Sequence, residues 1–371
     1  MDLIAVLILL SIGQGIFLGF LLLTLKRGNK TANRLLGILM LLFSLSISGF
    51  LLLRTGTYKY FPFIIGIPST VLFLFGPMFL FYVKELTFKN FKFKPSDLLH
   101  FIPFAALIIY KLPLYFGTIT QKMEYLKSFT DSPVHLSILA MQIVHLFIYI
   151  YYVNKMLNDY ETEIKNTKSS LEKINLNWIR FGINAFIFIF GLMAVFIVLF
   201  FAGFRLYDHF NNIIPVLVSI AILSIGYLGL SKPIIITEEQ ENNRSKKYEK
   251  STLTPERSEV YLKKLIKVID EKKPFLESDL TLQKLADMIA LPPYHLSQII
   301  NERMNQNFFD FINSYRVEEA KLLLADPRSE LLTVLAIAEE VGFNSKSSFN
   351  NAFKKCTSMT PTQYRESIRQ K

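Results

Sequence analysis

The chain has 371 residues, 51% of them hydrophobic, and a formal net charge of +11 at neutral pH. This length allows two domains, and the positive charge suits a membrane surface or a nucleic acid without choosing between them. The single cysteine, Cys356, excludes an internal disulfide and a zinc site built from several cysteines.

Apolar residues are concentrated before Lys232. A transmembrane helix needs roughly 20 mostly apolar residues to cross about 30 Å of hydrocarbon. Seven stretches meet this requirement: Leu3–Leu25, Leu35–Leu53, Phe61–Val83, Leu98–Phe116, Val134–Val153, Phe181–Phe204 and Ile213–Leu230. The first lacks the basic leader of a cleavable signal peptide. The sequence therefore predicts a seven-helix transmembrane bundle over residues 1–232.

The basic residues of the connections predict the orientation of this bundle, because cytoplasmic loops carry an excess of lysine and arginine. If the N-terminus is outside, the inner loops hold Lys26, Arg27, Lys30, Arg34, Lys84, Lys89, Lys92, Lys94, Lys155, Lys165, Lys168, Lys173 and Arg180. The outer loops then hold Arg54, Lys59, Lys111, Lys122, Lys127 and Arg205. The first set is about twice the second. We therefore expect the N-terminus outside and, after seven crossings, the C-terminus in the cytosol.

Polar side chains within the predicted spans are candidates for function, because burying them in lipid is costly. They are Gln14, His100, His135, Gln142, His145 and Asn184. Gln142 and His145 are three residues apart and share one helix face, so together they are the candidate intramembrane signal site, for a ligand or for protons. The alternative is that each bonds to a neighbouring helix or lies at the membrane interface.

Residues 233–255 form a polar linker of mixed charge, with four acidic residues within residues 238–249 and basic residues between them. As a flexible coil, such a segment spans on the order of 25 Å. It could instead be a charged helix that transmits a rotation, and the sequence leaves both alternatives open.

Residues 256–371 have apolar residues at helical spacing and predict a soluble, all-α domain. The first candidate helix-turn-helix covers about 281–302. Thr281 can cap its first helix, and Pro293 is well placed at the start of its second. The outward face of that second helix carries polar side chains that could reach DNA bases: Tyr294, His295, Ser297, Gln298 and Asn301.

The second candidate helix-turn-helix covers about 333–355 and repeats this plan. Thr333 and Ser345 can cap its helices, and Gly342 supplies a left-handed turn residue between them. Its outward face carries Lys346, Ser347, Asn350 and Asn351 for base contacts, with Lys354 and Lys355, and Arg316 on the connecting helix, for phosphates. That connecting helix of roughly 17 residues is about 25 Å long. Two recognition helices one DNA turn apart, about 34 Å, are therefore plausible.

These residues resemble the AraC/XylS family of bacterial transcription regulators over about the last 110 residues. The resemblance rests on residues 337–343 (IAEEVGF), 347–349, 353–355, Thr360-Pro361, Tyr364-Arg365 and residues 313–316 (NSYR). It implies sequence-specific promoter binding through both recognition helices, usually as a dimer and usually with activation of transcription. Asn351 stands where the family often has arginine, and Ser358 where it usually has glycine. These departures concern affinity and target sequence rather than the fold.

The sequence thus predicts a membrane-integrated one-component regulator in the bacterial cytoplasmic membrane. Its expected partners are double-stranded DNA, the lipid bilayer, a second copy of the chain, RNA polymerase and an unknown small-molecule or membrane signal, with no cofactor. The alternatives are a transporter or channel with a regulatory tail, and a helical interaction domain with a basic tail. An integral-membrane enzyme is disfavoured, because the membrane half shows no His-Glu-x-x-His motif and no nucleophile elbow.

Overall fold

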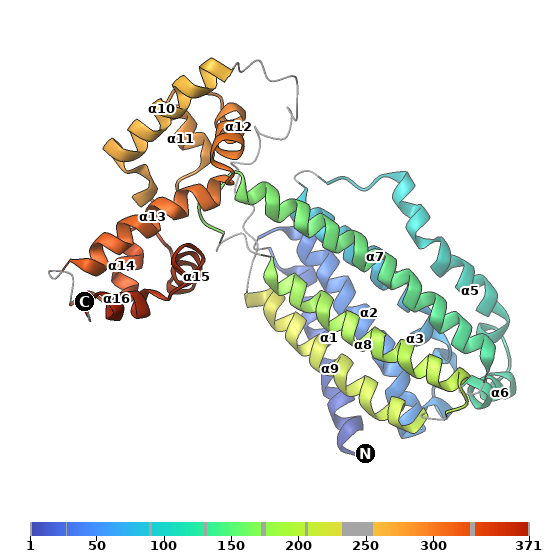
Figure 1. The fold of residues 1–371 in the computed structure, drawn as a ribbon. Helices are drawn as coiled ribbons and strands as arrows, with labels where there is room; N and C mark the ends of the chain where they lie inside the picture. The colour runs from blue at the N-terminus through green and yellow to red at the C-terminus, as the bar shows by residue number, and fades with distance from the viewer. Residues whose placement is uncertain are drawn as a thin grey trace. The chain divides into compact units, whose positions relative to one another are not determined.

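The structure, a computed structural model, describes residues 2–26, 28–88, 91–129, 132–171, 176–204, 207–231, 255–326 and 331–369. All regular elements in these ranges are helices (Figure 1). The chain divides into two compact units. The first unit comprises residues 1–157 and 176–236, and the second comprises residues 158–175 and 237–371. The predicted linker, 233–255, lies outside the described residues except for Pro255.

The first unit is built mainly from long apolar helices. Its helices are α1 (Leu3–Thr24), α2 (Lys30–Thr55), α3 (Ile67–Thr70), α4 (Leu72–Thr87), α5 (Ile102–Tyr115), α6 (Ile119–Phe129), α7 (Pro133–Lys165), α8 (Asn177–Phe201) and α9 (Tyr207–Ser231). The last part of α7, from residue 158, belongs to the second unit. Helices α1 and α2 pack closely, because glycines face each other at their crossing. A Cβ atom on Gly37 would lie only 2.8 Å from the carbonyl oxygen of Gly19.

Five helices of the described chain are long and apolar enough to cross a membrane, and a sixth is reached if a bent pair counts as one span. That pair, Pro62–Thr70 and Leu72–Thr87, is bent by 47°. The predicted seventh span falls on α9, whose described apolar part, Asn212–Ile225, is shorter than a full span. Helix α6 was not predicted. It lies within a predicted outer loop, and its charged residues give it too little apolar character to be counted as a membrane span.

The second unit holds the C-terminal helices and the segment after α7. Its helices are α10 (Pro255–Lys272), α11 (Leu282–Met288), α12 (Pro293–Met304), α13 (Phe308–Ala325), α14 (Val334–Glu340), α15 (Lys346–Thr357) and α16 (Pro361–Arg369), with a short 3-10 turn at Pro274–Leu276. The predicted caps are confirmed. The side chains of Thr281, Thr333 and Ser345 each accept a hydrogen bond from the backbone N–H three residues later.

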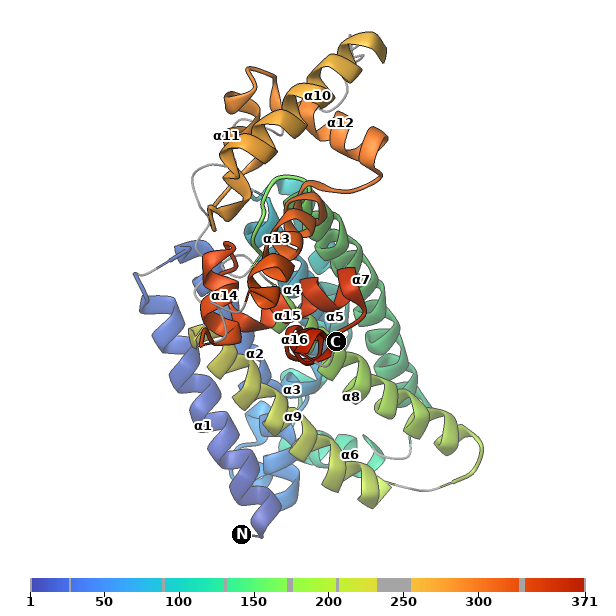
Figure 2. The same ribbon diagram turned by 60° about the vertical axis from the view of Figure 1, so that its left-hand side comes forward.

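Two hydrophobic clusters form the core of the second unit. The first gathers α10, α11 and α12 with the beginning of α13, up to Ile312. The second gathers α14 and α15 with the rest of α13, from Val317 onward. Helix α13 thus runs between two small helical bodies, as both views show (Figures 1 and 2). This arrangement leaves a junction at residues 313–316, between the two clusters.

Candidate nucleic-acid interface

The first helix-turn-helix is formed by α11 and α12. Its turn is closed by the Leu291 N–H, which donates to the Ala286 carbonyl at 3.0 Å. Ala290 in this turn has a left-handed backbone, with φ of 53°. Leu296, Ile299 and Ile300 of α12 are buried in the first cluster, and this burial fixes which face of the helix is turned outward.

The predicted base-reading residues of α12 are not all on that outward face. Tyr294 and Asn301 are exposed, and Ser297 and Gln298 are half-buried. His295 is different, because only 7% of it is exposed. Its burial lowers the pKa of the imidazole, so the ring is neutral at pH 7. The position of His295, four residues before the buried Ile299, argues against its predicted role in base contact.

The second helix-turn-helix repeats the geometry with α14 and α15. The Phe343 N–H donates to the Ala338 carbonyl at 2.8 Å, which is the same closing bond as in the first turn. Phe349 and Phe353 are fully buried. As a result, the predicted face of α15 is turned outward: Lys346, Ser347, Asn351, Lys354 and Lys355 are exposed, and Asn350 is half-buried.

Ser358 and Lys355, at the end of α15, were both singled out in the sequence. Ser358, which stands where glycine is usual in the AraC/XylS family, ends α15 in a left-handed conformation with φ of 61°. The turn therefore keeps its shape with a side chain present, at a cost of about 1 kcal/mol. The Lys355 ammonium forms an ion pair at 2.7 Å with Asp310, in the first turn of α13. Because this side chain is still 66% exposed, the ion pair leaves it open to solvent.

Arg316 contradicts the prediction that it contacts phosphate. It is 1% exposed, and its guanidinium donates to the carbonyls of Phe275 (2.6 Å), Glu277 (2.7 Å) and Ser169 (3.1 Å). It also donates to Asn313 Oδ1 and to Ser169 Oγ. A buried guanidinium occupied in this way has a structural role. The sequence did carry a signal for it, since Arg316 is four residues from both Ile312 and Ala320 on the buried stripe of α13.

The two candidates for an intramembrane signal site are both on α7 and have different partners. Gln142 is 3% exposed and donates through Nε2 to the Ser69 carbonyl at 2.8 Å. The His145 ring packs against Phe73 and Tyr149, with ring centroids 5.1 and 4.8 Å apart. Gln142 thus has the helix-to-helix bond that was the alternative interpretation of these residues.

The first unit does contain an apolar cavity of about 190 Å³, at a different place. Its walls include Phe43, Phe50, Ile65, Phe186, Met193 and Ile222. Neither Gln142 nor His145 is in these walls, but Ser69 is. Gln142 therefore contributes to the cavity indirectly, by holding the backbone of a residue that lines it.

Comparisons with known proteins support the architecture of the second unit. Residues 285–367 match the helix-turn-helix domain family. An uncharacterised HTH-type transcriptional regulator of Staphylococcus aureus (strain COL) is 35% identical over 102 residues, which are 28% of this chain and 13% of that protein. The uncharacterised HTH-type transcriptional regulator YtdP of Bacillus subtilis (strain 168) is 34% identical over 93 residues, 25% of this chain and 12% of that protein.

Among solved structures, the C-terminal domain of AraT, a response regulator from Geobacillus stearothermophilus, is 32% identical. The match covers 32% of this chain and 88% of that one, with a TM-score of 0.26. The chain thus spans about an eighth of the length of the curated relatives. The C-terminal part of this chain is an AraC-type helix-turn-helix domain.

Proposed function

We propose that this chain is a membrane-integrated, one-component transcription regulator. Its two recognition helices, α12 and α15, read DNA, and a signal sensed by the first unit controls them. The observation that carries the proposal is the repeated geometry of the second unit, in which two helix-turn-helix bodies each bury one face of the second helix and expose its polar face. RNA polymerase and a second copy of the chain are the expected protein partners.

The first unit supports the membrane assignment. Apolar residues face outward along several of its helices, with exposed fractions of 64% for Phe17, 63% for Phe188 and 67% for Val198. Such an apolar exterior is costly in water and favourable in lipid. We place the N-terminus outside the cytoplasmic membrane and the second unit in the cytosol, from the excess of basic residues in the inner loops.

The first test is binding of the full chain, reconstituted in lipid nanodiscs, to a genomic DNA library, followed by sequencing of the retained fragments. Enrichment of a shared site with two half-elements about one helical turn apart would support the proposal. Retention that is independent of sequence and lost at moderate salt would count against it. Solute flux through vesicles containing the chain, together with such weak retention, would favour the transporter alternative.

Replacement of Asn351 by alanine is expected to weaken binding to the selected site about tenfold. The side chain is exposed on the reading face of α15, and a good base contact contributes about 1–3 kcal/mol of discrimination. The measurement is a titration of the nanodisc-bound chain with the selected site and with a scrambled site. The loss is expected on the selected site alone. An equal loss on both sites would contradict a role in base reading.

Replacement of Lys354 by alanine is expected to act differently, because an exposed lysine at this place would contact phosphate. Affinity should fall to a similar extent on selected and scrambled sites. The slope of log affinity against log salt should become shallower by about one unit. Lys321 on α13, which pairs with Glu318, provides the matched control, and its replacement by alanine should leave the slope unchanged. An unchanged slope for Lys354→Ala would remove this residue from the phosphate contacts.

A further inference from the structure

A short segment far away in the sequence is built into the helix-turn-helix domain. Residues 158–175, which contain the end of α7 and the residues after it, belong to the second unit. Within them, Thr167–Ser170 lies along the residues that precede α11. Lys168 and Thr281 form an antiparallel β-bridge. The Leu282 N–H donates to the Thr167 carbonyl at 3.0 Å, and the Ser169 N–H donates to the Leu280 carbonyl at 3.3 Å.

This segment, Thr167–Ser170, is here called the clasp, and it sits where the two helix-turn-helix bodies meet. Ser169 is 1% exposed, and its hydroxyl donates to the Leu280 carbonyl at 2.6 Å. Asn344, from the turn before α15, donates to Ser170 Oγ at 2.9 Å. The clasp therefore contacts the first body through residues 280–282 and the second body through Asn344.

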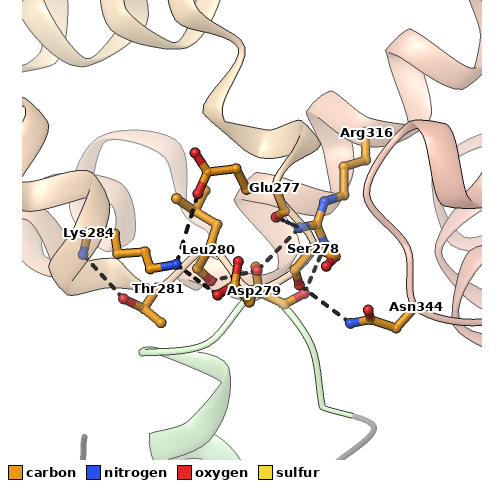
Figure 3. A network of polar contacts seen from close by, with 9 residues as sticks. Glu277, Ser278, Asp279, Leu280, Thr281, Lys284, Arg316 and Asn344 are labelled. Atoms are coloured by element: carbon orange, nitrogen blue, oxygen red, sulfur yellow. Dashed lines mark hydrogen bonds and ion pairs between the residues drawn. The ribbon is translucent and has the colours of Figure 1, made fainter.

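Arg316 ties the clasp to both bodies. Its guanidinium holds the clasp through the carbonyl and hydroxyl of Ser169, and holds the first body through the carbonyls of Phe275 and Glu277. It also lies over the ring of Phe343, in the turn of the second body, with 5.5 Å from the guanidinium carbon to the ring centroid. Figure 3 shows Arg316 and Asn344 pointing toward the residues around Ser278.

The clasp supplies acceptors that this buried cation needs. A guanidinium has five N–H donors, and the acceptors around Arg316 are uncharged carbonyl, amide and hydroxyl oxygens. Burial lowers the pKa of Arg316 to about 10, so it remains a cation at neutral pH. If the clasp left, Arg316 would lose its two hydrogen bonds to Ser169 and would need other acceptors. A buried donor without a partner is costly. The junction is therefore sensitive to whether the clasp is seated.

We propose that the clasp is an intramolecular ligand of the helix-turn-helix domain, and that its seating fixes the distance between α12 and α15. Because the clasp begins two residues after the end of α7 at Lys165, a displacement of that helix pulls directly on the junction. This proposal rests on the proposed function, and it names the contact through which the first unit controls DNA reading. It adds a second connection to the one through residues 233–255.

The seating is tested by cross-linking in the full chain. With the exposed Cys356 replaced by serine, Ser170 and Asn344 are both changed to cysteine, and a protease site is inserted between residues 240 and 241. A short bismaleimide is added in nanodiscs, and the chain is then cut. Because Ser170 Oγ and Asn344 Nδ2 are 2.9 Å apart, we expect the two fragments to stay joined. The control pair places the second cysteine at Glu366, an exposed position on α16, and should give much less product.

The control of DNA reading is tested with the spacing of the two half-elements. Insertion of five base pairs between them should weaken binding of the parent chain at least tenfold. Ser169→Pro removes both the N–H and the hydroxyl that hold the clasp, and it should reduce this discrimination at least threefold while binding to a single half-element is kept. Retained half-element binding shows that the domain is folded. Ser169→Ala should have a smaller effect, and Ser96→Ala, at an exposed serine of the first unit, should have none.

The outcomes separate the two proposals. Cross-linking no greater than in the control pair would overturn the seating of the clasp. Efficient cross-linking with unchanged spacing discrimination in Ser169→Pro would overturn its control of DNA reading. The parent chain could also cross-link efficiently but retain no specific DNA. This result would overturn the proposed function, and with it the control of DNA reading by the clasp, but not the seating of the clasp.

Discussion

Replacement of Arg316 by alanine is expected to lower the free energy of unfolding of the second unit by about 3 kcal/mol. The change removes a large, fully buried side chain and leaves the carbonyls of Phe275, Glu277 and Ser169 without this donor. Each buried polar group that loses its partner costs about 1–3 kcal/mol. The measurement is pulse proteolysis of the full chain in nanodiscs across a urea series, followed through the C-terminal fragment.

Lys321→Ala is the matched control for this experiment. Lys321 is on the same helix, and its ion pair with Glu318 lies at the surface, so its loss should change the unfolding free energy by no more than about 0.5 kcal/mol. Arg316→Lys keeps the charge but loses the planar fork of donors, and we expect an intermediate loss. If Arg316→Ala were as mild as Lys321→Ala, the buried network at the junction would not stabilise the domain.

Replacement of Gly342 by alanine is expected to lower the same free energy by about 3 kcal/mol. Gly342 has a left-handed backbone, with φ of 91°, which costs an alanine about 1 kcal/mol. The remainder comes from crowding, because a Cβ atom there would lie 2.7 Å from the Leu276 carbonyl oxygen and 2.8 Å from that of Phe275. These atoms belong to the backbone of the first body, so the two bodies must separate to make room.

The first turn offers an internal comparison for Gly342. Ala290 takes the corresponding position with φ of 53°, which shows that a residue with a Cβ can hold the left-handed backbone of this turn. Ala290→Gly is expected to change the unfolding free energy by less than about 1 kcal/mol, since relief of the strained backbone is offset by the greater freedom of glycine when unfolded. The same pulse proteolysis applies. A loss of similar size in both variants would show that turn geometry alone, rather than contact between the bodies, requires Gly342.

The local plan of the second unit could be predicted from the sequence because its signals are local. Capping residues such as Thr281 and Ser345, and apolar spacing along α12 and α15, act within one or two turns of helix. The apolar spacing also predicted which face of α15 is exposed, because Phe349 and Phe353 define the opposite, buried face. The burial of His295, which is 7% exposed, argues against a base contact, and spacing alone could not show this because the residue lies on the border of the buried stripe.

The junction could not be predicted, because its partners are remote in the sequence. Arginine is rarely buried, and this general preference favoured a phosphate contact for Arg316. The acceptors that make its burial possible include Ser169, which is 147 residues away, and no periodicity relates them. The cavity of the first unit was missed for a similar reason: Gln142 and His145 share a face of α7, but most of the cavity wall comes from other helices, and Leu139 is the α7 residue that lines it.

The position of the clasp also determines the order in which the second unit can be completed during synthesis. Ser169 leaves the ribosome 111 residues before its partner Leu280, an interval of roughly 5–20 s at ordinary rates of elongation. Helices α8 and α9 are made during that interval. The clasp is thus the first part of the domain to be made and must wait for the rest. A C-terminal fragment that begins after α9 lacks the clasp, and such a fragment would need the clasp supplied as a separate peptide to regain the native junction.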